Sequence, residues 1–311
     1  MEMRVTAHAI ATGTGAERRT GAQEAPSGGA RRSGVLPVPG AELYYEVRGD
    51  GPLLLVAQSG EGGAGRSVDL VDRLVRDHTV VTYDRRGLSR SALEPGRGVT
   101  MEQHADDVHR LLAALTDEPA RMLGLSLGAS IGLHLAVRHP EQLSVLVAHE
   151  PVSPRLLPVA EREAHERELV EIADLYRREG LGVALREVAR VLGIDPASPD
   201  REPGLSPQPP MAERTADFDF FITRDFTAVV EDTLDTAALA GLREGGPRIV
   251  PVTGRATPRT VFDYRCAEEL AVLLGTDAVE FPGGHNGNLT HPAAYAARLR
   301  EVLVATEGGR Y

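Results

Sequence analysis

The residues best suited to nucleophilic chemistry lie in the segment Gly124-Leu125-Ser126-Leu127-Gly128, a G-x-S-x-G motif. An apolar run precedes the motif and a run rich in alanine and glycine follows it, so Ser126 falls at a predicted strand-to-helix junction. Such a turn raises the serine hydroxyl above the sheet, and the helix N-terminus directs backbone N–H groups towards it. This context favours Ser126 as a catalytic nucleophile over a serine that merely fits a tight turn.

A base for this serine is predicted at His285, which follows the last apolar run after a Gly-Gly pair. A neutral imidazole can take the serine proton and return it to a leaving group. The other nine histidines have no comparable position. His109 and His134 are expected on a helix surface or in the core, and His291 at the start of a helix.

Alternating strands and helices must position these groups. Apolar runs predict strands at 35–38, 43–47, 53–57, 79–83, 121–125 and 143–148. Helical spacing predicts helices at 67–76, 101–115 and 127–138. Thr100 and Gln103 have the spacing of a capping box at the second of these helices. The rhythm predicts βαβ units and a mostly parallel sheet.

The rhythm breaks between residues 155 and 246, where the sequence is mainly helical. Helices are predicted at 160–178, 182–192, 211–224 and 227–242, with a Pro/Ser-rich linker at 195–210. The strand rhythm returns with strands at 248–253 and 278–281 and helices at 262–274 and 291–305. A helical insertion of about 90 residues is therefore predicted inside one α/β domain.

These observations divide the chain into three parts. Residues 1–33 are rich in Gly, Ala, Arg and Thr without periodicity, which predicts a disordered tail or a start site placed too early. Residues 34–152 and 247–311 form the predicted core, and residues 153–246 form the predicted cap. The first ten residues lack the apolar stretch of a secretory signal, so a cytoplasmic location is expected.

The chain resembles capped members of the α/β-hydrolase superfamily. The resemblance rests on the segments 124–128, 84–91 and 281–286, which occur in the family's order, and it covers about residues 35 to 305. It implies an eight-stranded, mostly parallel sheet with a helical lid inserted after strand six. It also implies catalysis at the carboxyl ends of the strands, where open α/β sheets place ligands.

The acid that would orient His285 departs from the common pattern of similar proteins, in which a Gly-x-Asp segment often follows strand seven. The corresponding segment here reads Gly254-Arg255-Ala256, so the usual carboxylate is missing. Some capped relatives carry the acid directly after strand six, where Glu150 stands. Glu150 is therefore the predicted acid and Asp263 a weaker candidate, and the alternative is that no acid exists.

The oxyanion loop departs from the family as well, because Gln58-Ser59-Gly60-Glu61 keeps the glycine of the common His-Gly pattern but not the histidine. The hole requires two backbone donors, so the amides of Glu61 and Leu127 are predicted to form it. The Glu61 carboxylate should point away from an oxyanion, or else bind a cationic or hydroxylated ligand. The segment Asp84-Arg85-Arg86-Gly87 is predicted to hold this loop by hydrogen bonds.

Three other features are assigned to structure rather than to chemistry. Asp106-Asp107 has the look of a metal site, but on an amphipathic helix the two carboxylates are predicted to be solvated. The segment 217–221 is predicted to pack aromatic rings over the pocket, where they would shape substrate choice or simply fill the core. Cys266 is predicted to be buried and inert.

Composition narrows the function classes. The 311-residue chain has a net charge of -11, which argues against nucleic acid and anionic membranes as partners. All 34 cationic residues are arginine, which excludes lysine Schiff-base chemistry, and a single cysteine excludes an intrachain disulfide. No apolar run approaches the roughly 18 residues of a membrane span. We expect a small-molecule substrate, no cofactor or metal, and a monomer or homodimer.

The leading hypothesis is a serine hydrolase that cleaves a small or medium ester, thioester or lactone. Ser126 would attack the carbonyl, His285 would move the proton and Glu150 would orient the ring. The first alternative is a tailoring enzyme of secondary metabolism, a cyclase, isomerase or C–C bond cleaving enzyme, in which His285 acts as base. The second is a hydrolase relative that binds a ligand without catalysis.

Overall fold

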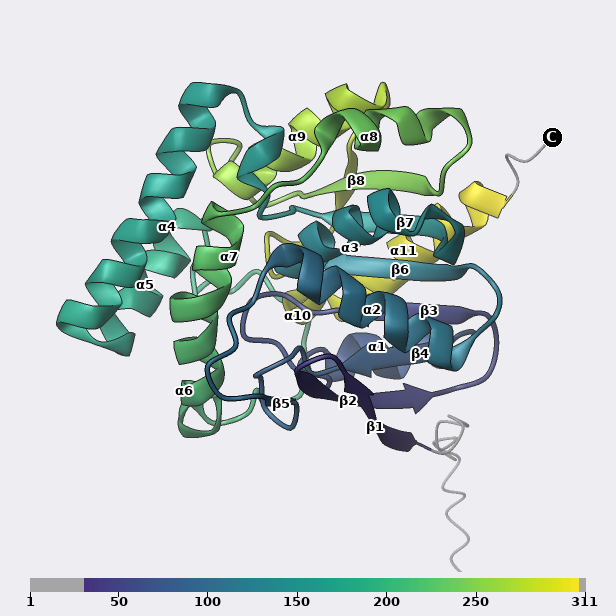
Figure 1. Cartoon of the computed structure of the whole chain (residues 1–311), viewed down its shortest axis with the longest axis horizontal. Coiled ribbons are helices and arrows are strands. Elements are labelled where there is room, and N and C mark those ends of the chain that lie inside the picture. Colours follow the sequence, from purple (N-terminus) through teal and green to yellow (C-terminus); the bar gives the residue numbers. More distant parts are fainter. Residues whose placement is uncertain (1–30, 308–311) are drawn as a thin grey trace, which may run out of the picture.

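The computed structural model describes residues 31–307, which fold around one twisted sheet with helices on both faces (Figure 1). Over these residues the sheet has nine strands, in the order β1-β2-β4-β3-β6-β7-β8-β9 with β5 beside β2. The strands are β1 (Arg32–Val38), β2 (Ala41–Arg48), β3 (Leu53–Ala57), β4 (Thr79–Tyr83), β5 (Ala92–Leu93), β6 (Ala120–Leu125), β7 (Leu143–His149), β8 (Arg248–Gly254) and β9 (Val279–Phe281). The predicted α/β-hydrolase sheet is confirmed, with the two-residue β5 added to the expected eight strands.

Strand direction defines the two edges of this sheet. β1 and β2 form an antiparallel hairpin, and β2 is antiparallel to β4. Every later pair on the path, from β4–β3 to β8–β9, is parallel. The carboxyl ends of the parallel strands therefore meet at one edge, the carboxyl edge, and their amino ends meet at the opposite amino edge.

Helices cover both faces because the parallel strands are apolar on both sides. On one face, Leu111, Ile131 and Leu270 join one core cluster, and on the other Leu70 and Leu299 join a second. The helices of the core are α1 (Val68–Leu74), α2 (Met101–Leu115), α3 (Leu127–Arg138), α9 (Phe262–Leu274), α10 (Gly287–Thr290) and α11 (Pro292–Glu307). α2, α3 and α9 thus lie on the face opposite to α1 and α11 (Figure 1).

The start of α2 confirms the predicted capping box, since Thr100 and Gln103 bond each other reciprocally. The predicted solvated face at Asp106-Asp107 is wrong for Asp107. That side chain is 1% exposed and accepts two hydrogen bonds from Arg86, at 2.6 and 2.7 Å. A bidentate arginine compensates the burial of the carboxylate, which helical periodicity alone does not reveal.

Within residues 153–246, helices α4, α5, α6 and α7 stand together at one end of the sheet, whereas α8 packs against α3 and α9 (Figure 1). The helices of this segment are α4 (Val159–Glu179), α5 (Leu181–Val191), α6 (Met211–Phe220), a π-helical turn (Phe221–Asp225), α7 (Phe226–Val230) and α8 (Thr236–Gly241). The segment predicted as a linker at 195–210 contains no helix or strand. The names cap and core are kept below for residues 153–246 and for the rest of the described chain.

The prediction of a single helix at 227–242 is wrong, because the helix is interrupted between α7 and α8. Asp232 accepts a hydrogen bond from the backbone of Leu234 and contacts His134 Nε2 at 2.7 Å. Asp235 then caps α8 by accepting from Ala238. Aspartate side chains that bond nearby backbone compete with helix, and two such residues end one helix and begin another.

The amino-terminal boundary differs slightly from expectation, since β1 begins at Arg32, inside the predicted tail. The remainder of that tail, residues 1–30, lies outside the described residues. Among the helices of residues 31–307, none is long and apolar enough to cross a membrane.

Candidate active site

Ser126 occupies a sharp turn between β6 and α3. Its backbone has φ 51° and ψ -113°, a left-handed conformation that a residue with a Cβ adopts only under strain. The flanking glycines allow the turn, since a Cβ at Gly124 would collide with α3 and one at Gly128 with the backbone at the end of β3. The motif therefore folds as predicted and presents the Ser126 hydroxyl at the carboxyl edge.

Glu150 follows β7, the strand that pairs with β6. It also has positive φ, 43°, and its side chain is fully buried. Its backbone N–H donates to Val252 at 3.0 Å, and its Oε1 accepts from the backbone of Gly254 at 2.7 Å. Contacts with β8 thus fix both the backbone and one oxygen of this carboxylate.

His285 lies in the loop after β9, and its ring faces the second oxygen of Glu150. Nδ1 lies 2.7 Å from Glu150 Oε2. An ionised carboxylate can only accept, so Nδ1 carries the proton and Nε2 is left as the basic nitrogen. The backbone of Ala256, at the position where similar proteins often place the acid, instead donates to Gly283 at 2.9 Å. Glu150, which follows the neighbouring strand β7, therefore supplies His285 with the carboxylate that position 256 lacks.

Burial and pairing set the charge states of these two groups. Burial raises the pKa of Glu150, but the hydrogen bond from His285 and nearby charges lower it more, so the net pKa lies below the ordinary value. Burial lowers the pKa of His285, but the hydrogen bond and charge of Glu150 outweigh it and hold the net pKa above the ordinary value. The lowered pKa favours an ionised Glu150, and the raised pKa makes His285 a stronger base than an ordinary histidine.

The loop at Gln58-Ser59-Gly60-Glu61 lies beside the Ser126 turn and is held by the segment 84–87, as predicted. Arg85 donates to the carbonyl of Gly60, and Asp84 accepts from Ala64 at 2.6 Å. Leu127 is the first residue of α3, so its N–H has no partner within the helix.

The Glu61 carboxylate is held by two arginines. It forms an ion pair with Arg66 at 3.1 Å and another with Arg214 of α6. The charge of this side chain is thus compensated by cations of the protein. Because two arginines already pair with this carboxylate, the geometry does not favour the alternative in which it binds a cationic or hydroxylated ligand.

Further contacts fix the cap over this loop. Arg85 pairs with Asp225 at 2.8 Å, and both side chains are buried. Asp217 of α6 accepts from the backbone of Ser89 at 2.6 Å. The predicted aromatic packing is also present: Phe221 approaches Gly60 so closely that a Cβ there would lie 2.6 Å from its ring.

A cavity lies between Ser126 and the cap. Its wall is mostly apolar and comes from α4, α5, the π-helical turn, α7 and the start of α9, including Leu169, Ile172, Val188, Phe221, Phe226 and Val261. His165, Glu168 and Asp263 complete the lining. Asp263, weighed as a weaker candidate for the acid, lies 3.9 Å from His285 Nε2, the nitrogen opposite the one that Glu150 holds. His165 was not predicted, because nothing in the spacing of α4 distinguishes it from other helical positions.

Two other groups of reactive side chains lie away from this cavity, and one of them, Cys266, was predicted to be buried. Cys266 is a free, fully buried thiol whose Sγ lies 3.3 Å from the carbonyl of Ser153, and burial raises its pKa well above the ordinary value. Within residues 31–307, one trio has the spacing of metal ligands: Glu102, His134 and Asp232. Its ligand atoms already bond protein groups, since His134 contacts Asp232 and Glu102 accepts from Thr233 at 2.6 Å.

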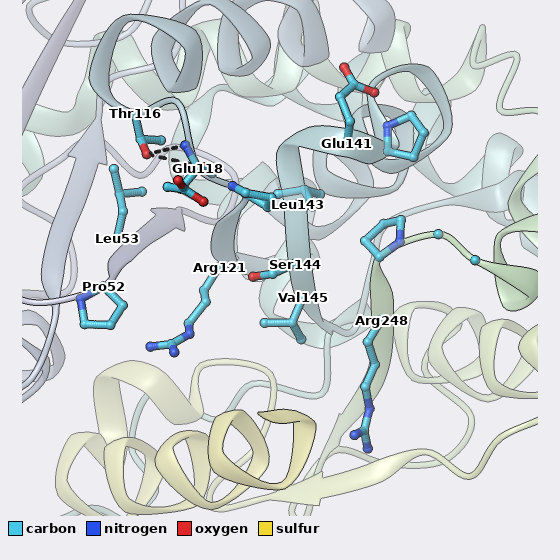
Figure 2. Close-up of a pocket in the computed structure, with 15 residues that line it drawn as sticks. Pro52, Leu53, Thr116, Glu118, Arg121, Glu141, Leu143, Ser144, Val145 and Arg248 are labelled. Carbon is cyan, nitrogen blue, oxygen red and sulfur yellow. Dashed lines mark hydrogen bonds between the residues drawn. The ribbon is translucent and has the colours of Figure 1, made fainter. Parts of the chain in front are cut away.

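A second, larger hollow opens at the amino edge of the sheet (Figure 2). It is lined by Pro52, Leu53, Thr116, Glu118, Arg121, Glu141, Leu143, Ser144, Val145 and Arg248, among others. Figure 2 shows that the side chains of Arg121, Glu141 and Arg248 extend apart rather than towards one point. No nucleophile and base meet there among the described residues, so the smaller cavity at Ser126 is the candidate active site.

Comparison with known proteins agrees with this fold. A family model described as the alpha/beta hydrolase fold matches residues 52–179. An uncharacterized hydrolase, YraK of Bacillus subtilis, is 37% identical over 273 residues, which is 87% of this chain and 96% of that protein.

Two solved structures are similar in fold. A thermophilic esterase from Thermogutta terrifontis has a TM-score of 0.64 at 20% identity, over 89% of this chain and 99% of its own. An enol-lactonase from Burkholderia xenovorans has a TM-score of 0.59 at 22% identity, over 87% and 100%. The sheet, the strained serine turn and the match to YraK over nearly its full length together show that this chain belongs to the α/β-hydrolase superfamily and is a hydrolase.

Proposed function

We propose that the protein is a serine hydrolase that cleaves a small or medium ester, thioester or lactone without a cofactor. Ser126 is the nucleophile, His285 the base and Glu150 the acid that orients it. The amides of Glu61 and Leu127 form the oxyanion hole. The observation that carries this assignment is the 2.7 Å contact between His285 Nδ1 and Glu150 Oε2. Both side chains are buried at the carboxyl edge, where the strained turn of Ser126 also lies.

The reaction proceeds in two halves. His285 Nε2 takes the proton of Ser126 as its oxygen attacks the carbonyl carbon, and the resulting oxyanion is held by the two amides. Collapse expels the alcohol or thiol, which receives that proton from His285 and leaves an acyl-enzyme. Water then attacks the acyl carbon, gives its proton to His285, and releases the carboxylic acid while Ser126 recovers its hydrogen.

The cavity supports a small-molecule substrate. Its wall is mostly apolar, and the cap closes over it through the buried Arg85–Asp225 pair. A water-poor site strengthens the electrostatic stabilisation of an oxyanion. A hydrocarbon acyl chain would contact residues such as Leu169 and Phe226.

Labelling with a fluorophosphonate probe tests the assignment. The folded protein should form one adduct, located on Ser126 by peptide mass spectrometry, and the variant Ser126→Ala should form none. The control is heat-unfolded protein, which should lose the label because the turn and His285 are no longer assembled. A folded protein that hydrolyses an ester while its label sits elsewhere would contradict the proposal.

The tailoring-enzyme alternative rests on the missing acid at Ala256. Glu150 supplies a carboxylate to His285, so the residue at position 256 no longer favours that alternative. The same variant discriminates between the two: turnover of the native substrate by Ser126→Ala would require a reaction without an acyl-enzyme. The non-catalytic alternative is disfavoured by the hydrolase relative that covers 87% of this chain.

A further inference from the structure

Beside the Ser126 turn, the cavity wall contains a second pair of buried ionisable side chains, His165 of α4 and Asp263 of α9. They are 3% and 1% exposed, and both line the cavity that Ser126 lines. His165 Nε2 lies 3.3 Å from Asp263 Oδ1. One residue belongs to the cap and the other to the core, so the pair sits where the two parts close over the serine.

Within the described residues, the hydrogen-bonding capacity of this pair is not filled, because both ring nitrogens of His165 and Oδ1 of Asp263 are buried without a hydrogen bond. The ring nitrogens are held only by ion pairs, with Asp263 at 3.3 Å from Nε2 and with Glu168 at 3.7 Å from Nδ1. An unsatisfied buried polar atom costs about 1–3 kcal/mol, so such atoms are rare in folded proteins. Three such atoms in one cavity wall point to a ligand that supplies their missing hydrogen bonds.

The pair also lies close to the reacting atoms. Asp263 Oδ2 is 3.9 Å from His285 Nε2, the nitrogen that exchanges a proton with Ser126 in the proposed mechanism. A group bound to Asp263 therefore lies only a few atoms from the scissile carbonyl. Since Glu150 already holds Nδ1, Asp263 is not needed to orient the ring.

The charge and orientation of His165 suit a fixed donor. Burial disfavours the charged ring, but the carboxylates of Asp263 and Glu168 raise the pKa of His165 to about 9. The ring also stacks on Phe262, with centroids 4.8 Å apart, which restricts its rotation. At neutral pH the cavity thus presents a cationic donor beside the side chain of Asp263.

We propose that His165 and Asp263 form a polar subsite for a hydroxyl or amide group that the substrate carries one or two carbons from the scissile carbonyl. Such a group both donates and accepts, so it can donate to Asp263 Oδ1 and accept from a ring N–H of His165. The apolar wall then contacts the hydrocarbon part of the same molecule. The inference rests on the proposed function and narrows its substrate class to hydroxy- or amido-substituted esters, thioesters and lactones.

The first arm of the test compares matched esters with the wild-type protein. Hydrolysis of ethyl butyrate, ethyl 2-hydroxybutyrate, ethyl 3-hydroxybutyrate and ethyl N-acetylglycinate is followed by titration of the acid released. We expect kcat/KM for at least one substituted ester to exceed that for ethyl butyrate by roughly 10- to 100-fold, the usual range for a hydrogen bond to a charged group. Equal or lower values for all three substituted esters would overturn the subsite.

The second arm uses the double variant His165→Gln/Asp263→Asn, which removes both charges together and so leaves no lone buried ion. Its preference for the substituted ester, taken as the ratio of the two kcat/KM values within this variant, should fall to within about twofold of unity. The control is Glu171→Gln, a charge removal on the exposed side of α4, which should keep the wild-type preference. An unchanged preference in a folded double variant would overturn the proposal, and the wild-type comparison decides the matter if that variant does not fold.

The two proposals fail in different ways. If the wild-type protein labels at Ser126 and hydrolyses ethyl butyrate without preferring any substituted ester, only the subsite is wrong. If it neither labels at Ser126 nor hydrolyses any of the four esters, the serine-hydrolase proposal falls and the subsite falls with it.

Discussion

The hollows at the two edges of the sheet differ in how their ionisable groups are held. At the amino edge, Glu141 and Arg248 are exposed and their side chains extend apart (Figure 2). At the carboxyl edge, Glu150 and His285 are buried and bonded to each other, although the cavity beside them is smaller. Taking charged groups out of water is costly, so a cluster of buried and aligned charges distinguishes a site better than volume does.

The sharpest way to break this contrast is Ser126→Ala. We expect kcat on a hydrolysed ester to fall by about 10⁴- to 10⁶-fold, because the nucleophile is lost while the oxyanion donors remain. Steady-state kinetics measure the effect, and an unchanged unfolding midpoint shows that the fold is kept. A decrease in kcat of less than tenfold would show that Ser126 is not the nucleophile.

Glu150→Gln tests whether the buried carboxylate matters beyond filling space. The amide preserves shape but cannot stabilise a charged ring or hold the same tautomer, so we expect kcat to fall by about 10²- to 10⁴-fold with KM little changed. The matched control is Glu280→Gln, an exposed acid of β9 paired with Arg255 at the surface, which should stay within twofold of wild type. Equal effects of the two variants would contradict the assignment of the acid.

Asp225→Ala measures how firmly the cap closes the carboxyl edge. It leaves the buried guanidinium of Arg85 without its carboxylate, so the free energy of unfolding should drop by about 3–5 kcal/mol. Urea unfolding measures this, with Asp174→Ala as the control, since that surface pair with Arg177 should contribute under about 1 kcal/mol. Similar losses for both variants would show that the cap does not depend on this pair.

The pH dependence of kcat/KM should reveal the raised pKa of His285. The base works only when neutral, so activity should be lost as pH falls through a value above 6.5, the ordinary histidine pKa. In Glu150→Gln the larger raising influence on the pKa of His285 is gone, while burial and the smaller raising influence of Asp263 remain, so the acidic limb of the profile should move to lower pH. If the acidic limb of the profile stays in place or moves to higher pH in this variant, the group that titrates is not controlled by the Glu150–His285 bond.

The smallest effect is expected at the amino edge. Arg248→Gln alters an exposed side chain of the larger hollow, so kcat/KM should change less than twofold and stability by under about 0.5 kcal/mol. Kinetics on the same ester and urea unfolding provide the measurement. A loss above tenfold would bring that hollow into the function.

Local signals were enough to predict most of the architecture. The apolar runs and the capping box at Thr100 mark β3 to α2 within a few residues, because strand burial and helix capping leave local patterns. Glu150 could be placed beside His285 only by combining its position after a strand with a family resemblance. Pairing between distant segments left no such pattern: Arg86 with Asp107, and His165 with Asp263, depend on how helices pack.

The location of Glu150 on β7 has a consequence for the loop that follows β8. The last residue of β8, Gly254, donates its backbone N–H to Glu150, and the loop after it places no side chain in the proposed triad. The sequence of that loop up to Val261 is therefore released from the constraint that the usual arrangement imposes there. Because Val261 and Asp263 line the cavity, this stretch is a natural place for selectivity to diverge among relatives while the chemistry is kept.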